Sequence, residues 1–381
     1  MATAIICEFN PFHNGHKYLL QTAKMITNQP IVAIMSGSFT QRGEVAITDK
    51  FTRTKTALQN GADLVIELPT AYAISNAQRF ATAGTQLAAA FPMVNTLAFG
   101  CESDNTENLL IAANAINDND VKATLKQNMK SGEYYPKALE NAVRKIKGDT
   151  IADILATPNN ILAVEYLRGL KGTNINPLPI KRIGVEHDSK ISTDTIASAS
   201  HIRELVRNNQ TAESFAPYIP NNITYPEKLD IALLYKLRSM SCEDIAKLPD
   251  ISEGLENRIY SAVKSCNSVS EIIESVKTKR YTHARIRRIL CSALLSITEE
   301  LQNTPIEYVR VLGFSSIGAS LLKDCKLSVV TSASNGLKLS ENIKKLLSND
   351  ILATDIAALA YESTQKCNAD FTTPIIKINT T

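Results

Sequence analysis

Four short apolar runs alternate with helical patterns in the first hundred residues, and this alternation limits the fold more than any other feature. The runs lie at 3–7, 30–35, 63–68 and 96–100, with predicted helices at 49–60 and 75–91. Apolar strands separated by helices pair in parallel, with right-handed crossovers. The pattern therefore predicts an α/β domain with a Rossmann-like parallel sheet. Ligands of such sheets bind at the carboxyl ends of the strands.

The turn after the first run carries two histidines around a glycine, in the order His13, Asn14, Gly15 and His16. Unpaired backbone N–H groups and the helix dipole attract anions to the start of a helix. His13 and His16 are one helical turn apart and can face the same side, while Gly15 leaves room for a nucleotide. An ordinary turn with two surface histidines is the alternative. The position between strand and helix favours a phosphate site, with His13 and His16 as catalytic candidates.

Small hydroxyl residues lead into another predicted helix at residues 198–203, which read Ser-Ala-Ser-His-Ile-Arg. Serine hydroxyls, free helix N–H groups and a guanidinium group all suit phosphate. We expect Ser198, Ser200 and Arg203 to contact phosphate. A serine-capped helix with a solvated Arg203 is the alternative.

The rest of the chain divides at about residue 216, where the alternation of strands and helices stops. The polar segment 103–156 reads as a helical insertion, and 177–185 as a further strand. Helical patterns dominate later, most clearly at 284–298, where apolar residues recur at helical spacing. We expect a catalytic domain at 1–215 and a mostly α-helical domain at 216–381. Two short strands are predicted within the second part, at 308–314 and 327–331.

Composition limits the class of protein. The seven cysteines form no CxxC pair, so neither a disulfide framework nor a zinc site is indicated. No apolar run reaches the length of a membrane span. We therefore expect a cytoplasmic protein with reduced thiols and no membrane partner. The net charge of +3 is nearly balanced, so any nucleic-acid site must be a local patch.

The strongest such patch is the segment 277–288, which holds six Lys or Arg residues and no acid. Arg280, Arg287 and Arg288 are expected to share one helix face, which can follow RNA phosphates. A solvated helix face is equally compatible with such a charge run. The candidate RNA-binding residues are Lys279, Arg280, Arg287 and Arg288.

The motif HxGH after a first strand resembles the HIGH-type nucleotidylyl transferases. Longer matches resemble one branch, the tRNA(Met) cytidine acetate ligases. They are EFNPFHNGH at 8–16, MSGSFTQRGE at 35–44, NNILAVEYL at 159–167, IKRIG at 180–184 and LGFSSIGASLLK at 312–323. Residues 198–203 resemble the second superfamily signature, which grips the β- and γ-phosphates. Ala199 and His201 stand where that signature often has a basic residue or threonine.

The resemblance implies where ATP binds. In that family the contacts fall on the first-strand stretch and on positions that match Gly100, Asn160 and Arg182. The expected ATP-binding residues are Cys7, Glu8, Phe9, Asn10, Pro11, His13, Asn14, Gly15, His16, Leu19, Gly100, Asn160, Arg182, Ser198, Ser200 and Arg203. Magnesium is compatible with ATP, but no carboxylate cluster requires a dedicated protein metal site.

The resemblance also implies a reaction. Acetate attacks the α-phosphate of ATP, which gives acetyl-adenylate and pyrophosphate. The wobble cytidine of elongator tRNA(Met) then takes the acetyl group and becomes N4-acetylcytidine. His13 and His16 are expected to donate hydrogen bonds and, if protonated, to add positive charge. The alternatives are a small-molecule nucleotidylyltransferase and a non-enzymatic nucleotide- or RNA-binding protein.

Overall fold

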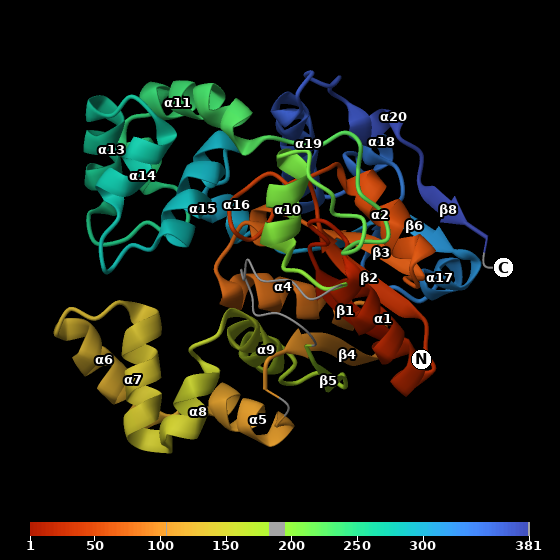
Figure 1. The fold of residues 1–381 in the computed structure, drawn as a ribbon, viewed down its shortest axis with the longest axis horizontal. Helices are drawn as coiled ribbons and strands as arrows, with labels where there is room; N and C mark the ends of the chain where they lie inside the picture. Colours follow the sequence, from red (N-terminus) through yellow and green to blue (C-terminus); the bar gives the residue numbers. More distant parts are fainter. Residues whose placement is uncertain (104, 183–194, 380–381) are drawn as a thin grey trace.

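The computed structural model describes residues 1–103, 105–182 and 195–379 (Figure 1). Its centre is an eight-stranded sheet in the order β5-β4-β1-β2-β3-β6-β7, with β8 paired to β6. The strands are β1 Ala2–Cys7, β2 Ile31–Ser36, β3 Leu64–Leu68, β4 Val94–Cys101, β5 Asn176–Lys181, β6 Tyr308–Ser315, β7 Ser328–Val330 and β8 Ile376–Ile378. Strands β1 to β5 pair in parallel, as predicted, and β6 runs antiparallel to β3. The predicted α/β class is confirmed.

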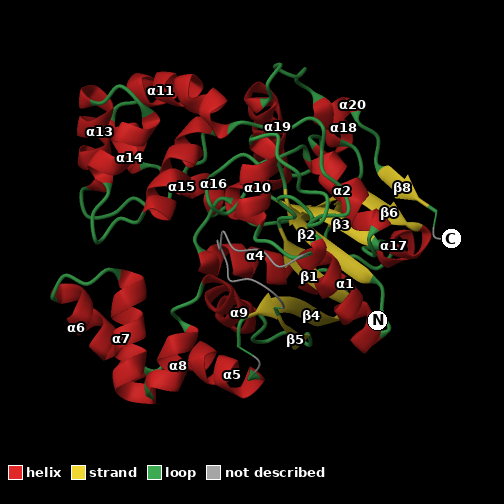
Figure 2. Cartoon of the chain, in the orientation of Figure 1, coloured by secondary structure: helices red, strands yellow, loops and turns green. Residues whose placement is uncertain are grey.

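Helices cover both faces of the sheet (Figure 2). Those connecting or following the first five strands are α1 Asn14–Thr27, α2 Lys50–Gln59, α3 Thr70–Ala73, α4 Ala77–Ala89, α9 Pro158–Gly169 and α10 Ala199–Arg207. Residues of α1 and α2 share one core cluster with alternate residues of β1 and β2. Residues of α4 and α9 pack against the other residues of the same strands. This alternation follows from the two-residue period of a strand.

Two helical segments lie apart from the strands in Figure 1. The predicted insertion forms α5 Thr106–Ala115, α6 Asn119–Lys130, α7 Tyr135–Lys147 and α8 Asp149–Ile154. The second segment forms η1 Pro226–Leu229, α11 Asp230–Ser239, α12 Cys242–Ala246, α13 Leu255–Ser265, α14 Val269–Val276, α15 His283–Leu294 and α16 Glu299–Gln302. Helix α15 ends before the predicted residue 298, because Ser296 adopts a left-handed conformation with φ of 55°.

The C-terminal residues return to the sheet. Beside β6 to β8 they form α17 Ser316–Leu321, α18 Ala333–Gly336, α19 Glu341–Ala357, η2 Ala358–Ala360 and α20 Ala369–Thr372. The strands predicted at 308–314 and 327–331 are present as β6 and β7. Residues on both sides of the expected boundary at 215/216 thus contribute to one sheet, with α11 to α16 between them. The strand predicted at 177–185 ends at Lys181 in the described part of the chain, and residues 183–185 lie outside it.

The strand order places a topological switch point between β1 and β4. From β1 the chain continues to β2 and β3 on one side, then crosses to β4 and β5 on the other side of β1. Crossover loops at such a point leave the sheet in opposite directions, so a crevice opens at the carboxyl ends of the two central strands. The turn with His13 and His16 follows β1 at this end.

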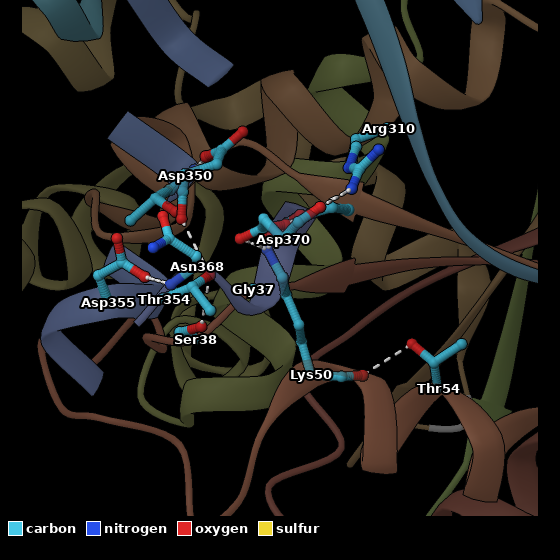
Figure 3. Close-up of polar contacts among 12 residues, drawn as sticks. Gly37, Ser38, Lys50, Thr54, Arg310, Asp350, Thr354, Asp355, Asn368 and Asp370 are labelled. Atoms are coloured by element: carbon cyan, nitrogen blue, oxygen red, sulfur yellow. Dashed lines mark hydrogen bonds and ion pairs between the residues drawn. The ribbon is translucent and has the colours of Figure 1, made fainter. Parts of the chain in front are cut away.

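A buried charge network attaches the C-terminal segment to this sheet. Lys50, which is fully buried, lies 2.8 Å from a Glu67 oxygen and 2.9 Å from an Asp370 oxygen. Figure 3 shows Lys50 and Arg310 converging on Asp370, and the Arg310 guanidinium is 3.6 Å from it. Asp350 accepts hydrogen bonds from the Tyr308 hydroxyl at 2.5 Å and from the Thr70 backbone at 2.7 Å. Buried charges require such partners.

The network contains three carboxyl groups, Glu67, Asp350 and Asp370, against the two cations Lys50 and Arg310. Burial raises the pKa of Glu67 to about 7, with a further contribution from Asp350 and Asp370. A proton on Glu67 would balance the charge of the network. Because the folded state binds this proton more tightly than the unfolded chain, its contribution to stability is complete below about pH 4.5 and is lost as pH rises through about 7.

Replacement of Glu67 by Gln should therefore weaken the fall in unfolding free energy between pH 5 and pH 7. Urea unfolding at a series of pH values would measure this slope. Glu341→Gln is the matched control, because that side chain is 75% exposed and its loss should leave the slope as in the wild type. An unchanged slope in Glu67→Gln would contradict the assignment.

Candidate active site

A cavity of about 390 Å³ opens at the switch point. Its wall combines the ends of β1 and β4, the start of α1, the loop after β2 and the start of α10. The structure brings most of the predicted ATP-binding residues together in this wall. They are Cys7, Glu8, Phe9, Asn10, His13, Gly15, His16, Leu19, Gly100, Arg182, Ser200 and Arg203.

Four predicted residues, Pro11, Asn14, Asn160 and Ser198, lie outside this lining. Pro11 follows a cis peptide bond in the turn after β1. The Asn14 amide donates to the Thr195 and Ser214 carbonyl oxygens, both at 2.9 Å. These contacts attach the start of α1 to the segments on either side of α10.

Asn160 and Ser198, the other two residues outside the lining, hold backbone segments beside the cavity. Asn160 is buried, and its side-chain oxygen accepts from the backbone N–H groups of Glu102 at 2.9 Å and Ser103 at 3.1 Å. The neighbouring Asn159 lines the cavity instead. The Ser198 hydroxyl accepts from His201 N at 3.1 Å and so caps α10. Contacts of Asn160 and Ser198 with ATP stay predictions.

The histidine pair is fixed by reciprocal capping of α1. His13 is the N-cap residue, and its Nδ1 accepts from Gly15 N at 3.1 Å. His16 Nδ1 accepts from His13 N at 3.3 Å. The two rings stack with centroids 3.8 Å apart. An imidazole whose Nδ1 accepts a hydrogen bond carries its proton on Nε2, so this geometry assigns the Nε2–H tautomer to both rings.

His16 is neutral at physiological pH. Burial lowers the pKa of His16 well below its ordinary value, and the neighbouring His13 and Arg182 lower it further. Its ring also packs edge-on against Phe9, with centroids 5.1 Å apart. The sequence allowed a protonated histidine at this position, but the environment of His16 disfavours one. His16 can therefore contribute a directed hydrogen bond, while positive charge comes from arginine.

A neighbouring side chain requires glycine at position 15 of the site but not at position 100. A Cβ atom at Gly15 would lie 2.9 Å from His13 Cε1, so a larger residue would displace the capping ring. A Cβ atom at Gly100 would lie 3.4 Å from Arg182 Cγ, which is an ordinary van der Waals contact. Gly15 was expected to make room for a nucleotide, and the structure shows that it first makes room for the His13 ring.

Arginines supply the charge of the wall. Arg182 follows β5, and its backbone N–H donates to the Cys101 carbonyl at 3.0 Å, which holds the residue beside the end of β4. Arg203, on α10, donates to the Asn10 carbonyl at 2.8 Å. Glu8 lines the same cavity, and burial raises the pKa of its carboxyl group. With Arg42 of the loop after β2, three arginines thus line a cavity that is also lined by the two histidines.

Arg53 is a supporting residue that the sequence analysis did not identify. It is buried in α2 and donates to the Glu8 carbonyl at 2.7 Å, the Ser36 carbonyl at 3.0 Å and the Gly37 carbonyl. These acceptors follow or end β1 and β2. Arg53 therefore holds the carboxyl ends of the two strands together. Its partners are backbone atoms, which leave no signature in the sequence.

The loop after β2 separates the cavity from α15. Gln41, in this loop, lines the cavity, and its N–H donates to a Glu8 carboxylate oxygen at 2.6 Å. Gly43, at the tip, has φ of 74°, and a Cβ atom there would lie 2.8 Å from the backbone of Arg287. Glu44 forms an ion pair with Arg287. The loop thus touches both the cavity and the basic helix.

The four candidate RNA-binding residues occupy different surroundings. Arg280 precedes α15, so it does not share a helix face with Arg287 and Arg288 as expected, because the helix begins only at His283. Arg280 pairs with Glu253 at 3.0 Å, and Arg288 with Asp250 at 3.2 Å. Lys279 is exposed and belongs to the same segment. Their roles in RNA binding stay predictions.

Two further features of the described residues concern a metal site and a membrane-spanning helix. No group of three or more His, Cys, Asp or Glu residues in that part of the chain could hold a metal ion. None of the helices that the structure describes combines the length and apolar character needed to cross a membrane.

The neutral state of His16 is directly measurable. ¹⁵N-edited NMR should show the Nε2–H tautomer of His16 at pH 7, with a pKa well below the ordinary value because the ring is buried. The resonance can be assigned through its loss in His16→Asn. Titration of this ring at or above the pKa of a free histidine would contradict the geometry.

Comparison with known proteins identifies the family. The HIGH Nucleotidyl Transferase profile matches residues 1–371. The tRNA(Met) cytidine acetate ligase of Thermoanaerobacter sp. (strain X514) is 39% identical, covering 98% of this chain and 99% of the relative. That of Clostridium tetani (strain Massachusetts / E88) is 37% identical, covering 98% and 99%.

Solved structures agree with this result. Apo Thermotoga maritima TmcAL is similar with a TM-score of 0.92 at 29% identity, and TmcAL bound with alpha-thio ATP with a TM-score of 0.89 at 28%. Each match covers 100% of both chains. The chain therefore belongs to the tRNA(Met) cytidine acetate ligase family of HIGH nucleotidyl transferases.

Proposed function

We propose that this protein is an ATP-dependent acetate ligase that acetylates the wobble cytidine of elongator tRNA(Met). The observation that carries the proposal is the stacked histidine pair at the start of α1, beside Arg182 and Arg203 in one cavity. The names of its relatives supply the substrate, and the alpha-thio ATP complex of TmcAL supports a nucleotide as ligand.

The first step is activation of acetate. An acetate oxygen attacks the α-phosphorus of ATP, the bond to the bridging oxygen breaks, and pyrophosphate leaves. His13 and His16 donate from Nε2 to phosphate oxygens, while Arg182 and Arg203 offset the charge on the leaving group. Neither histidine acts as a general base, because acetate carries no proton at neutral pH. The product of this step is acetyl-adenylate.

The second step is transfer to RNA. The N4 amine of cytidine attacks the acyl carbon and loses a proton, and AMP leaves with the electrons of the broken C–O bond. The tRNA must therefore reach the cavity that holds the adenylate. The loop at residues 40–44 lies between this cavity and α15, so an RNA bound along α15 would be close to the acyl group.

The basic segment is the proposed RNA-binding surface. Arg280 is 48% exposed and Arg287 47% exposed in their side chains, and each pairs with one acid. Exposed ion pairs contribute little in water, so RNA phosphates can replace these acids. Arg288 is more buried, at 13% exposed, and Lys279 completes the surface.

Magnesium would enter with the ATP phosphates, and a tRNA substrate agrees with a cytoplasmic location.

The proposal predicts ATP-dependent transfer of labelled acetate to tRNA. His16→Ala should lower the rate about 100-fold or more, because a donor to the reacting phosphate is lost. The unfolding midpoint should also fall, because the hydrogen bond from His13 N is lost, so the rate is measured at a temperature where the variant is fully folded. Acid precipitation of the labelled tRNA measures the transfer. His283→Ala is the control for the first step, since this exposed histidine lies outside the cavity.

The same assay separates the alternatives. Absence of label in tRNA with the wild-type protein would overturn the proposal. Pyrophosphate release with a small phosphorylated acceptor and no RNA would instead indicate a small-molecule nucleotidylyltransferase. Full turnover by His16→Ala would show that the catalytic assignment is wrong.

A further inference from the structure

The cavity has two chemically different walls. The histidines and arginines described above form the polar wall, which begins at α1. The opposite wall is apolar and consists of Ile6, Ala77, Phe80, Phe99, Leu162 and Tyr166. Ile6 and Cys7 are successive residues of β1, so their side chains point to opposite faces of the sheet. Ile6 packs with the core below α4 and α9, and Cys7 with the core below α1.

Tyr166 is the polar member of this apolar wall. Its side chain is 5% exposed, and its ring lies 5.6 Å from that of Phe99. The Tyr166 hydroxyl forms no hydrogen bond within the described part of the chain, and it is not fully enclosed, so it can meet a ligand in the cavity that the residue lines. Burial raises the pKa of Tyr166, and the nearby Cys7 and Glu8 raise it further, so the hydroxyl keeps its proton. A hydroxyl that faces a cavity and has no protein partner can donate its hydrogen bond to a ligand atom there.

The apolar wall behind this hydroxyl is closely packed and cannot move to admit a larger ligand. Ile6 packs so closely on α4 that a Cβ atom at Gly84 would lie 2.5 Å from Ile6 Cδ1. Phe80 and Phe99 are 2% and 3% exposed and belong to the same core cluster. A close-packed core transmits strain instead of yielding to a larger ligand. The apolar wall therefore has a fixed depth.

The chemistry of this wall selects the kind of ligand. Phosphates carry several charges and match the polar wall, which holds the imidazoles and guanidinium groups. A nucleobase carries several donors and acceptors on its edge, and most would lack partners beside one phenol. A short carboxylate has one alkyl group for the aromatic rings and two oxygens. One oxygen can attack the α-phosphorus while the other accepts from the phenol.

We propose that Ile6, Phe80, Phe99 and Tyr166 form the subsite for the short-chain carboxylate. The rings of Phe80 and Phe99 contact its methyl group, and the Tyr166 hydroxyl donates to the oxygen that does not attack. Tyr166 keeps its proton throughout, since the attacking oxygen forms the bond to phosphorus and pyrophosphate leaves with the electrons of the broken P–O bond. This assignment rests on the proposed function and names the residues that select the acid.

The first test replaces Tyr166 by Phe. The measurement is the acetate-dependent exchange of labelled pyrophosphate into ATP, in the absence of tRNA. The KM for acetate should rise about tenfold, because a hydrogen bond to a charged oxygen is lost. The KM for ATP should change less than about twofold, since ATP lies on the polar wall. The thermal midpoint should not fall, because the hydroxyl has no hydrogen-bond partner among the residues that the structure describes.

The matched control is Tyr72→Phe. The Tyr72 hydroxyl donates to the Thr304 carbonyl at 2.6 Å, and this residue lies outside the cavity lining. Its replacement should lower the thermal midpoint and leave the KM for acetate unchanged. The two tyrosines therefore separate loss of stability from loss of carboxylate binding.

The second test enlarges the wall with Phe80→Ala. The ratio of kcat/KM for propionate to that for acetate should rise at least about tenfold, because the added space admits one more methylene group. This ratio does not depend on the folded fraction, so partial unfolding cannot produce it.

The outcomes are distinct. A wild-type protein with no acetate-dependent exchange would overturn the proposed function and the subsite together. If the wild type shows normal exchange and Tyr166→Phe raises the KM for ATP but not the KM for acetate, the apolar wall binds the nucleotide base. Unchanged acetate KM in Tyr166→Phe, or unchanged selectivity in Phe80→Ala, would overturn the subsite and leave the proposed function standing.

Discussion

The buried ammonium group of Lys50 is the constraint on which the arrangement of the sheet depends. It lies between Glu67 of β3 and Asp370 of α20, and both ion pairs are excluded from water. Loss of the Lys50 cation would leave buried carboxylates uncompensated, which typically costs about 3–5 kcal/mol. The C-terminal segment therefore cannot detach from β3 and α2 without exposing or stranding these charges.

The same network reaches the site through the end of β2. A Cβ atom at Gly37 would collide with a Glu67 oxygen, so the chain turns close to the paired carboxylate. Arg53 then joins the carbonyl oxygens of Gly37 and Glu8, and the latter leads into the turn with the histidines. Each step is a buried polar contact with few alternative geometries. Rigid strand ends thereby give the histidine pair a fixed position before a nucleotide arrives.

The sequence predicted the parts of the molecule that are local. Apolar runs and turn residues predicted the sheet, and the spacing of His13 and His16 predicted a shared face at the start of α1. It did not reveal Arg53, whose acceptors are backbone carbonyls, or the pairing of Lys50 with Asp370, which are 320 residues apart. The chemistry of Tyr166 was also hidden, because an aromatic residue in an apolar helix usually indicates only core packing. Arg280 was misplaced, since charge periodicity did not indicate that α15 begins at His283.

The central claim is that the histidine pair binds the reacting phosphate of ATP, and a crystal structure of this protein with alpha-thio ATP tests it most directly. The account predicts an α-phosphate oxygen about 3 Å from His16 Nε2, with the β- and γ-phosphates directed toward Arg203. A nucleotide whose α-phosphate lies beyond hydrogen-bonding reach of both Nε2 atoms would contradict the account.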